Sequence, residues 1–213
     1  MKSREAPLEP GRCALLVVDL QQAFCRRGSG LLSGPRWPQG KHDAFFDRLE
    51  QQALPNAARL VAGFRAAGQE VIHTVIQSLT KDGRDRSLDH KLSDFHIPAG
   101  DPGGRPMPEV APAGDEILLP KTASGVFNAT NIEYLLRNIG IAELAICGVF
   151  TNQCVESAVR DAADRGFYVT LVDDACAGTT PDEHTQSVRA MAAYGRVRST
   201  AALLEELRGM NQR

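Results

Sequence analysis

The stretch Leu15–Phe24, with the sequence LLVVDLQQAF, indicates the fold most directly. It belongs to a predicted strand over Cys13–Leu20, in which an apolar run reaches a carboxylate at Asp19. A short run rich in Val and Leu is typical of a strand buried on both faces of a parallel sheet. A charged group that ends such a strand needs a partner or water. Asp19 is therefore a candidate functional residue.

Similar apolar runs recur along the chain, separated by segments with helical spacing. Further strands are predicted over Glu70–Gln77, Glu116–Leu119, Glu143–Val149 and Phe167–Val172, with a short one around Arg196–Ser199. Helices are predicted over Pro55–Ala67, Ala129–Ile139, Asn152–Arg165 and Pro181–Tyr194. This alternation predicts an α/β protein, in which helices cover both faces of a parallel sheet.

Composition limits the class of protein. The 213 residues favour a single domain over 1–213, and 43% hydrophobic with 23% charged residues excludes a disordered chain. A net charge of -2 without a basic run argues against nucleic-acid and membrane partners. The longest apolar run, Cys13–Val18, is too short to span a bilayer, and the N-terminus resembles no signal peptide. We therefore expect a soluble, cytoplasmic protein.

The cysteines and histidines suggest no metal site. Five cysteines, an odd number without a CxxC pair, indicate neither a disulfide framework nor a zinc knuckle. The histidines also show no ligand spacing: they are His42, His73, His90, His96 and His184. We expect no metal and no cofactor.

Residues 78–114 interrupt the alternation of strands and helices. The segment begins with dense charge and continues with five prolines and several glycines. A connection this long is an active-site lid, a subunit-contact arm or a disordered insertion, and the first two are favoured. We call residues 78–114 the arm.

Three reactive side chains come at or just after the ends of predicted strands: Asp19, Lys121 and Cys154. Ligands of open α/β sheets bind beyond the carboxyl ends of the strands, so the fold brings these ends together. Thr151 or Asn152 can cap the following helix, which places Cys154 in its first turn, where the helix dipole favours a thiolate. Alone, Cys154 would more often be an inert core residue. Together, the three residues suggest a nucleophile, a base and a cation that orients the base.

The chain resembles the isochorismatase-like cysteine hydrolase family. The resemblance extends from about Ala14 to about Ser199 and depends on LLVVDLQQAF, on LPKTASGVFNATNIEYLLRNIGI and on GVFTNQCVESAVRDAADRGFYVTLVDDAC. It implies a three-layer α-β-α fold with a six-stranded, mostly parallel sheet, and an Asp–Lys–Cys triad at Asp19, Lys121 and Cys154. It also implies a cis peptide at Val149–Phe150, an oxyanion hole from the backbone of Val149, Phe150 and Cys154, and a homodimer or homotetramer.

Departures from the family's patterns narrow the expected chemistry. Nicotinamidase-type members carry an Asp-x-His motif after the second strand, where this chain reads VIQSLTKDG. Members that cleave isochorismate use no nucleophilic thiol. The arm and the segment around Lys121 look most like ureidoacrylate-type amidohydrolases. We therefore expect hydrolysis of a small ureido, carbamoyl or linear amide substrate through a thioester, with release of ammonia. The alternatives are a catalytically silent binding module and an isochorismatase- or nicotinamidase-like activity.

Substrate contacts are less specific in the sequence. Gln77, at the end of the second strand, is a candidate ligand for an amide or carboxylate, but it can equally satisfy local backbone. Phe24 and Phe127 are candidate apolar walls, with ordinary core packing as the alternative. Trp37 lies in a Gly/Pro-rich loop and lines a pocket or packs at a subunit interface.

Overall fold

The buried apolar runs pair into one six-stranded sheet in the computed structural model, which describes residues 2–33 and 40–210. Neighbouring strands are all parallel, in the order β3-β2-β1-β4-β5-β6. The predicted α/β sheet is confirmed, and Trp37 lies outside the described residues. The strands are β1 (Cys13–Val18), β2 (Glu70–Ile76), β3 (Ile117–Lys121), β4 (Glu143–Val149), β5 (Tyr168–Ala177) and β6 (Arg196–Arg198).

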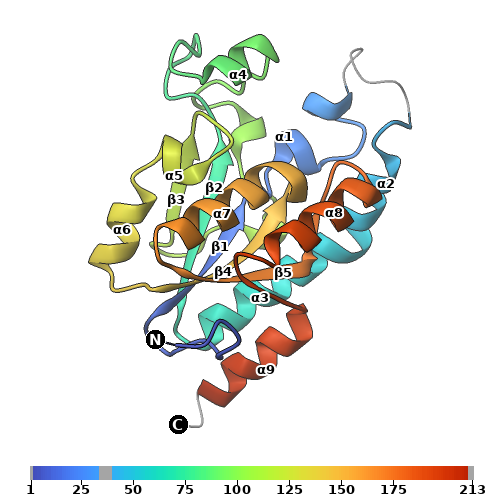
Figure 1. Ribbon diagram of the computed structural model, residues 1–213. Helices are drawn as coiled ribbons and strands as arrows, with labels where there is room; N and C mark the ends of the chain where they lie inside the picture. The colour runs from blue at the N-terminus through green and yellow to red at the C-terminus, as the bar shows by residue number, and fades with distance from the viewer. Residues whose placement is uncertain (1, 34–39, 211–213) are drawn as a thin grey trace.

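Helices cover both faces of the sheet (Figure 1), with α3 and α9 on one face and α7 and α8 on the other. The α-helices are α1 (Gln22–Cys25), α2 (Asp43–Arg48), α3 (Leu54–Ala66), α4 (Leu88–Leu92), α5 (Val126–Ala129), α6 (Ile132–Asn138), α7 (Glu156–Asp164), α8 (Pro181–Met191) and α9 (Thr200–Met210). Two π-helical turns, η2 (Leu49–Ala53) and η5 (Thr151–Val155), precede α3 and α7. Within the described residues, no helix is both long and apolar enough to cross a bilayer.

Several helical segments differ from the prediction. The predicted helix Ala129–Ile139 is split between α5 and α6, because the Thr130 hydroxyl donates to the Val126 carbonyl and accepts from the Ile132 amide. The helix predicted from Pro55 is instead continuous with α2 through η2. Helix α9 was not predicted. It packs against α3 at Gly63, where a Cβ would lie 2.3 Å from Leu204.

The strand order places a topological switch between β1 and β4. The chain adds β2 and β3 on one side of β1 and then crosses to form β4 on the other side. The crevice beyond the carboxyl ends of two such strands is where ligands bind in open α/β sheets. Asp19 follows β1 and Cys154 follows β4, so both candidate residues lie at this switch point.

The arm crosses the carboxyl end of the sheet (Figure 1), with α4 at the end of the molecule opposite the termini. Gln21 fastens it there. Its buried side-chain amide donates to the carbonyls of Ile76 and Gly103 and accepts from the Ile76 amide N–H. Backbone bonds from Met107 to Leu20 and from Gln22 to Arg105 reinforce this attachment. Because buried backbone groups need partners, these contacts hold the arm close to the end of β1.

Candidate active site

The three predicted reactive residues meet inside the protein. Lys121 Nζ lies 2.8 Å from Asp19 Oδ2 and 3.4 Å from Cys154 Sγ. Lys121 is the last residue of β3, and its long side chain spans β2 to reach Asp19. All three side chains are buried. The site thus combines a carboxylate, an ammonium group and a thiol that are all shielded from bulk solvent.

The two oxygens of Asp19 have different environments. Oδ1 accepts a hydrogen bond from the Thr74 hydroxyl at 2.8 Å. Oδ2 forms the ion pair with Lys121 but has no partner of hydrogen-bond geometry among the described residues. Asp19 also has a positive φ of 52°, a region that Asp tolerates better than most residues. The backbone turn after β1 therefore presents Oδ2 as the oxygen available to accept a proton.

Lys121 is held in its charged form. Its Nζ donates to the carbonyls of Ala123 at 3.1 Å and Ser124 at 2.9 Å, in addition to its contacts with Asp19 and Cys154. Burial lowers the pKa of Lys121, but Asp19 and Cys154 outweigh this effect and raise the pKa above its ordinary value. An ammonium group has only three protons to donate. Lys121 therefore suits electrostatic support and orientation of Asp19, and not proton abstraction.

Cys154 lies in the π-helical turn η5, where the Val155 amide reaches back to the Phe150 carbonyl. We expected a side chain at Thr151 or Asn152 to cap an α-helix; the N-cap is Phe150, without a side-chain hydrogen bond. Burial raises the pKa of the Cys154 thiol to about 12, although Lys121 lowers it. The expected helix-stabilised thiolate is therefore replaced by a protonated thiol, because burial opposes charge more strongly than Lys121 supports it.

The peptide bond between Val149 and Phe150 is cis, as the resemblance implied. Just before it, Gly148 has a φ of 128°, and a Cβ at this position would lie 2.0 Å from the Val18 carbonyl oxygen. Only glycine allows the two central strands to approach this closely. The close approach brings the backbone after β4 next to the end of β1.

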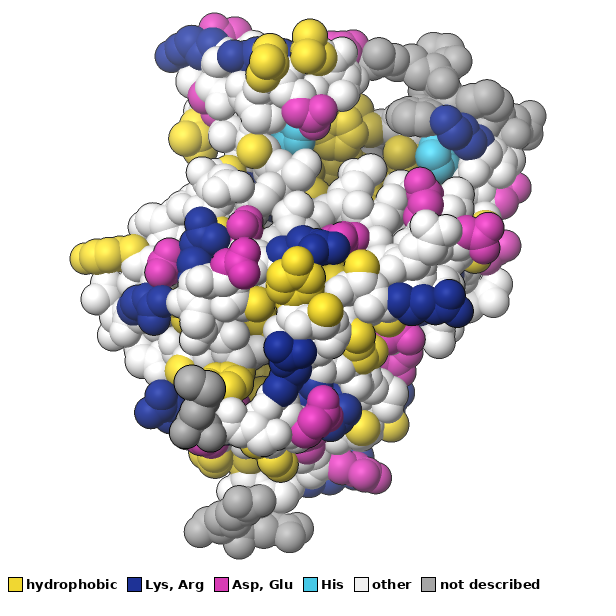
Figure 2. Space-filling view, in the orientation of Figure 1, with side chains coloured by type: hydrophobic (Ala, Val, Ile, Leu, Met, Phe, Trp, Pro, Cys, Tyr) yellow, Lys and Arg dark blue, Asp and Glu magenta, His cyan; other side chains and the backbone are white. Residues whose placement is uncertain are grey.

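A cavity of about 560 Å³ opens beside these groups at the carboxyl end of the sheet. Asp19 and Cys154 line it, and the arm contributes Asp89, His90, Ser93 and Phe95. Figure 2 shows a hollow below the segment that carries α4, with hydrophobic and histidine side chains at its rim. The arm therefore forms part of the wall of the candidate site within the same chain.

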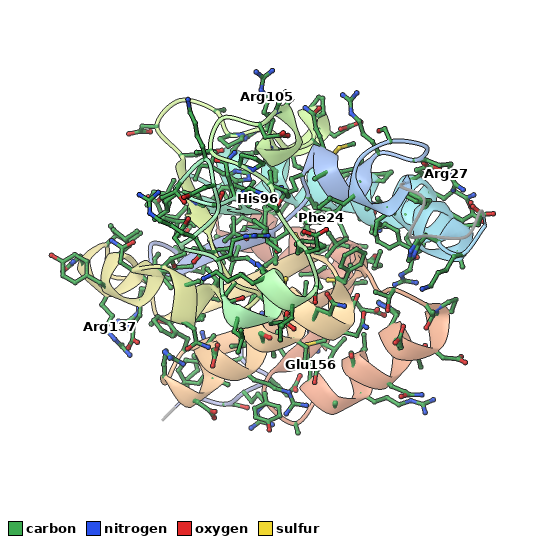
Figure 3. The ribbon with its side chains drawn as sticks, turned by 90° about the horizontal axis from the view of Figure 1, so that it is seen from above. Phe24, Arg27, His96, Arg105, Arg137 and Glu156 are labelled. Atoms are coloured by element: carbon green, nitrogen blue, oxygen red, sulfur yellow. The ribbon has the colours of Figure 1, made fainter. Side chains whose placement is uncertain are left out.

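Of the predicted substrate contacts, the structure brings Phe24 to the cavity. Its ring stacks on Phe95 with centroids 5.1 Å apart and meets the edge of Phe150 at 6.0 Å. Figure 3, seen from above, shows Phe24 near the centre of this end of the molecule. Phe24, Phe150 and Phe95 of the arm therefore form a continuous aromatic wall of the cavity.

Gln77 and Phe127 are not among the described residues that line this cavity. The Gln77 amide donates to the Pro98 carbonyl at 3.3 Å, so it satisfies backbone of the arm. The Phe127 ring packs 6.0 Å from the Phe167 ring, with the Arg165 guanidinium above it. Both residues therefore have the structural role that the sequence analysis gave as the alternative. Gln77 satisfies local backbone, and Phe127 packs in the core.

Sequence reasoning missed a connected set of three polar side chains behind the cysteine turn, which runs from buried Thr151 to the partly exposed Asp173. Thr151 Oγ1 lies 2.8 Å from His184 Nδ1, and His184 Nε2 lies 2.7 Å from Asp173 Oδ1. Hydrogen bonding to His184 lowers the pKa of Asp173. These three hydrogen-bonded side chains connect η5 with α8 and β5. Neither the spacing nor the types of these residues identify the hydrogen-bonded set in the sequence, because its three members come from separate elements.

Sequence reasoning also missed His90 as a cavity residue. The side chain is 4% exposed, and its ring lies 5.3 Å from the Phe95 ring. Among the described residues, no group of three or more His, Cys, Asp or Glu side chains is placed to hold a metal ion. The expectations of no metal and no cofactor stay predictions.

Comparisons with known proteins agree with this architecture. A model of the Isochorismatase domain matches residues 13–202. The isochorismatase family protein YddQ of Bacillus subtilis is 28% identical, over 90% of this chain and 98% of its own length. The ureidoacrylate amidohydrolase RutB of Agrobacterium fabrum is 28% identical, over 82% of this chain and 80% of its own length.

A crystal structure of a cysteine hydrolase from Pseudomonas syringae pv. phaseolicola has a TM-score of 0.81 and 23% identity, covering 97% of each chain. At this identity the likeness concerns the fold alone. The family match extends over almost the whole described chain and includes all three strand-end residues. The chain belongs to the isochorismatase family of hydrolases, which includes amidohydrolases.

Proposed function

We propose that the protein is a cysteine-dependent amidohydrolase that cleaves a C–N bond of a small ureido, carbamoyl or linear amide substrate. The observation that supports this most is the placement of Lys121 Nζ 2.8 Å from Asp19 Oδ2 and 3.4 Å from Cys154 Sγ, beside a cavity. A protonated thiol becomes a nucleophile when an adjacent base removes its proton, and Asp19 is the carboxylate next to it. The amidohydrolase relative supports the same reaction class.

The first half of the reaction forms a thioester. Asp19 Oδ2 accepts the thiol proton while Cys154 Sγ bonds to the carbonyl carbon, and the C=O electron pair moves to the oxygen. Backbone N–H groups of Phe150 and Cys154, at the turn after Val149, stabilise this oxyanion. Loss of one such donor typically costs about 2.7–4 kcal/mol. Protonated Asp19 then gives its proton to the nitrogen, the C–N bond breaks, and ammonia or a small amine leaves.

The second half restores the enzyme. Asp19 accepts a proton from water, whose oxygen attacks the thioester carbon; the C–S bond breaks and Cys154 regains its proton from Asp19. Lys121 keeps Asp19 oriented through both halves and offsets the negative charge that develops nearby. A carbamoyl substrate would release its amine in the first half and carbamate in the second, and the carbamate decomposes to carbon dioxide and one ammonia.

The test measures ammonia release from ureido acids, biuret-like compounds, carbamoyl amino acids, nicotinamide and aliphatic amides in the presence of a chelator. We expect turnover that is lost in Cys154→Ala and retained in Cys147→Ala, a matched change at a buried thiol of β4 outside the described cavity lining. Turnover that survives Cys154→Ala contradicts the nucleophile. Release from none of the compounds favours a silent binding module.

A further inference from the structure

His90 is a buried polar side chain at the cavity, and no described residue satisfies one of its ring nitrogens. The ring is 4% exposed and lines the cavity, and its Nδ1 has no hydrogen-bond partner among the described residues. A buried polar atom of this kind destabilises a protein unless it is satisfied, so the His90 ring has hydrogen-bonding capacity that the packing does not use. Because Nδ1 itself has almost no accessible surface, a ligand in the cavity would meet the accessible edge of the His90 ring.

The ring of His90 is uncharged near neutral pH. Burial lowers the pKa of His90, and the positive charge of Lys121 lowers it further, although Asp89 and Asp19 oppose this effect. A neutral imidazole has one N–H donor and one acceptor nitrogen. Such a ring matches an amide or ureido group, which also carries both a donor and an acceptor. It attracts a carboxylate less than a charged imidazolium would.

The charge around the cavity also disfavours an anion. The charged side chains among the described lining residues are Asp19 and Asp89, and both are acidic. The ammonium group of Lys121 is already paired with Asp19. Arg86 of the arm donates to the Phe95 carbonyl at 3.0 Å and is not among the described lining residues, and Figure 3 shows Arg27, Arg105 and Arg137 at the periphery of the view. A ligand carboxylate near Asp89 would be repelled, and a ligand cation would be attracted.

The remaining wall suits an apolar body. Phe24 and Phe95 stack at 5.1 Å with an interplanar angle of 12°, and Ile76 also lines the cavity. His90 packs on the same Phe95 ring. The polar nitrogen and the negative charge of Asp89 are thus carried by α4 next to an aromatic surface.

We propose that the cavity selects amides whose non-reacting part is uncharged or cationic over amides that carry a carboxylate, with His90 as the hydrogen-bonding residue and Asp89 as the charge filter. This inference rests on the proposed function for the class of ligand. The proposed selectivity concerns binding of the non-reacting end of the substrate, whereas the proposed function concerns cleavage of the C–N bond.

The test uses three ureas of matched length: 3-ureidopropionate, its uncharged primary amide, and 3-aminopropylurea, which is cationic. Calorimetry measures their binding to Cys154→Ala, which removes the proposed turnover. We expect the acid to bind at least about fivefold more weakly than the other two, with the difference shrinking as salt rises. Equal or tighter binding of the acid, or no binding of any of the three, overturns the inference.

Variants assign the effect to residues. Asp89→Asn should reduce the discrimination between the acid and the cation about threefold, whereas Asp82→Asn, an exposed charge of the arm outside the described cavity lining, should leave it unchanged. His90→Phe keeps an aromatic ring and should weaken binding of the uncharged amide about fivefold. If His90→Phe does not fold, His90→Gln serves instead, and should retain more of the binding. Equal effects of Asp89→Asn and Asp82→Asn, or undiminished binding by the His90 variant that folds, overturn the assignment.

Failure of this inference is distinguishable from failure of the proposed function. Discrimination by Cys154→Ala without any turnover by the unsubstituted protein contradicts the hydrolase and supports the inference. Turnover with a preference for the acid supports the hydrolase and overturns the inference.

Discussion

Lys121 Nζ lies 2.8 Å from Asp19 Oδ2, and neither side chain is more than 1% exposed. An ion pair of this kind holds both groups in place because each would be unfavourable in the interior without the other. The same contact orients the proposed base toward the thiol. Stability and reactivity therefore depend on one pair of atoms.

Lys121→Met should lower the free energy of unfolding by about 3–5 kcal/mol, because it leaves a buried carboxylate unpaired. Urea unfolding measures this change. The double variant Asp19→Asn, Lys121→Met should recover part of the stability but none of the activity. Arg84→Met, which removes an exposed ion pair with Asp82, should change stability by less than about 1 kcal/mol. A loss below about 1 kcal/mol in Lys121→Met would contradict the importance of the pair.

Cys154 should be the first cysteine alkylated by iodoacetamide near pH 7. It lines the cavity, and Asp19 is positioned to take its proton, whereas Cys13, Cys147 and Cys176 are fully buried. Peptide mass spectrometry measures the rate at each site. Asp19→Asn should slow labelling of Cys154 at least about tenfold, because the amide cannot accept the proton. Uniform labelling of all cysteines would argue against an activated thiol.

His184→Ala should lower kcat about ten- to a hundredfold while KM changes little, because loss of the contact with Thr151 lets the cysteine turn shift. Steady-state kinetics on an amide found in the substrate panel measures both constants. His73→Ala is the matched control: His73 is also buried and pairs with a carboxylate, Glu116, but is not among the described cavity residues. If both variants lose kcat in proportion to their loss of stability, His184 has no specific positioning role.

The free energy of unfolding should fall as pH rises above about 9. Burial raises the thiol pKa of Cys13, Cys147 and Cys154 from 9.0 to about 12, so the folded protein keeps protons that the unfolded chain releases. The stabilising contribution is therefore complete below pH 9 and is lost toward pH 12, at up to about 1.4 kcal/mol per pH unit for each thiol. Urea midpoints at pH 8 and pH 10 measure the slope. Cys147→Ala should flatten it; an unchanged slope would contradict the assignment.

Much of the fold is predictable because it depends on local sequence. The apolar runs of β1, β2, β4 and β5 can be recognised as strands in the sequence, since a strand buried on both faces needs a short continuous run of apolar residues. Helix α9 was missed because its burial depends on a distant glycine in α3. The π-helical turn at Cys154 depends on how β4 leaves the sheet, which residue types alone do not reveal.

The residues of the candidate site also fall into those that the sequence identifies and those that only the packed structure reveals. Asp19, Lys121 and Cys154 can be placed at or just after strand ends from the residues alone, because connectivity and apolar patterning are local properties of the chain. Long-range packing accounts for the rest: His90 and Asp89 of the arm line the cavity, Gln77 turns to the backbone of the arm, and burial keeps the thiol protonated. These outcomes depend on which distant segments exclude water from one another, and that is a property of the packed molecule.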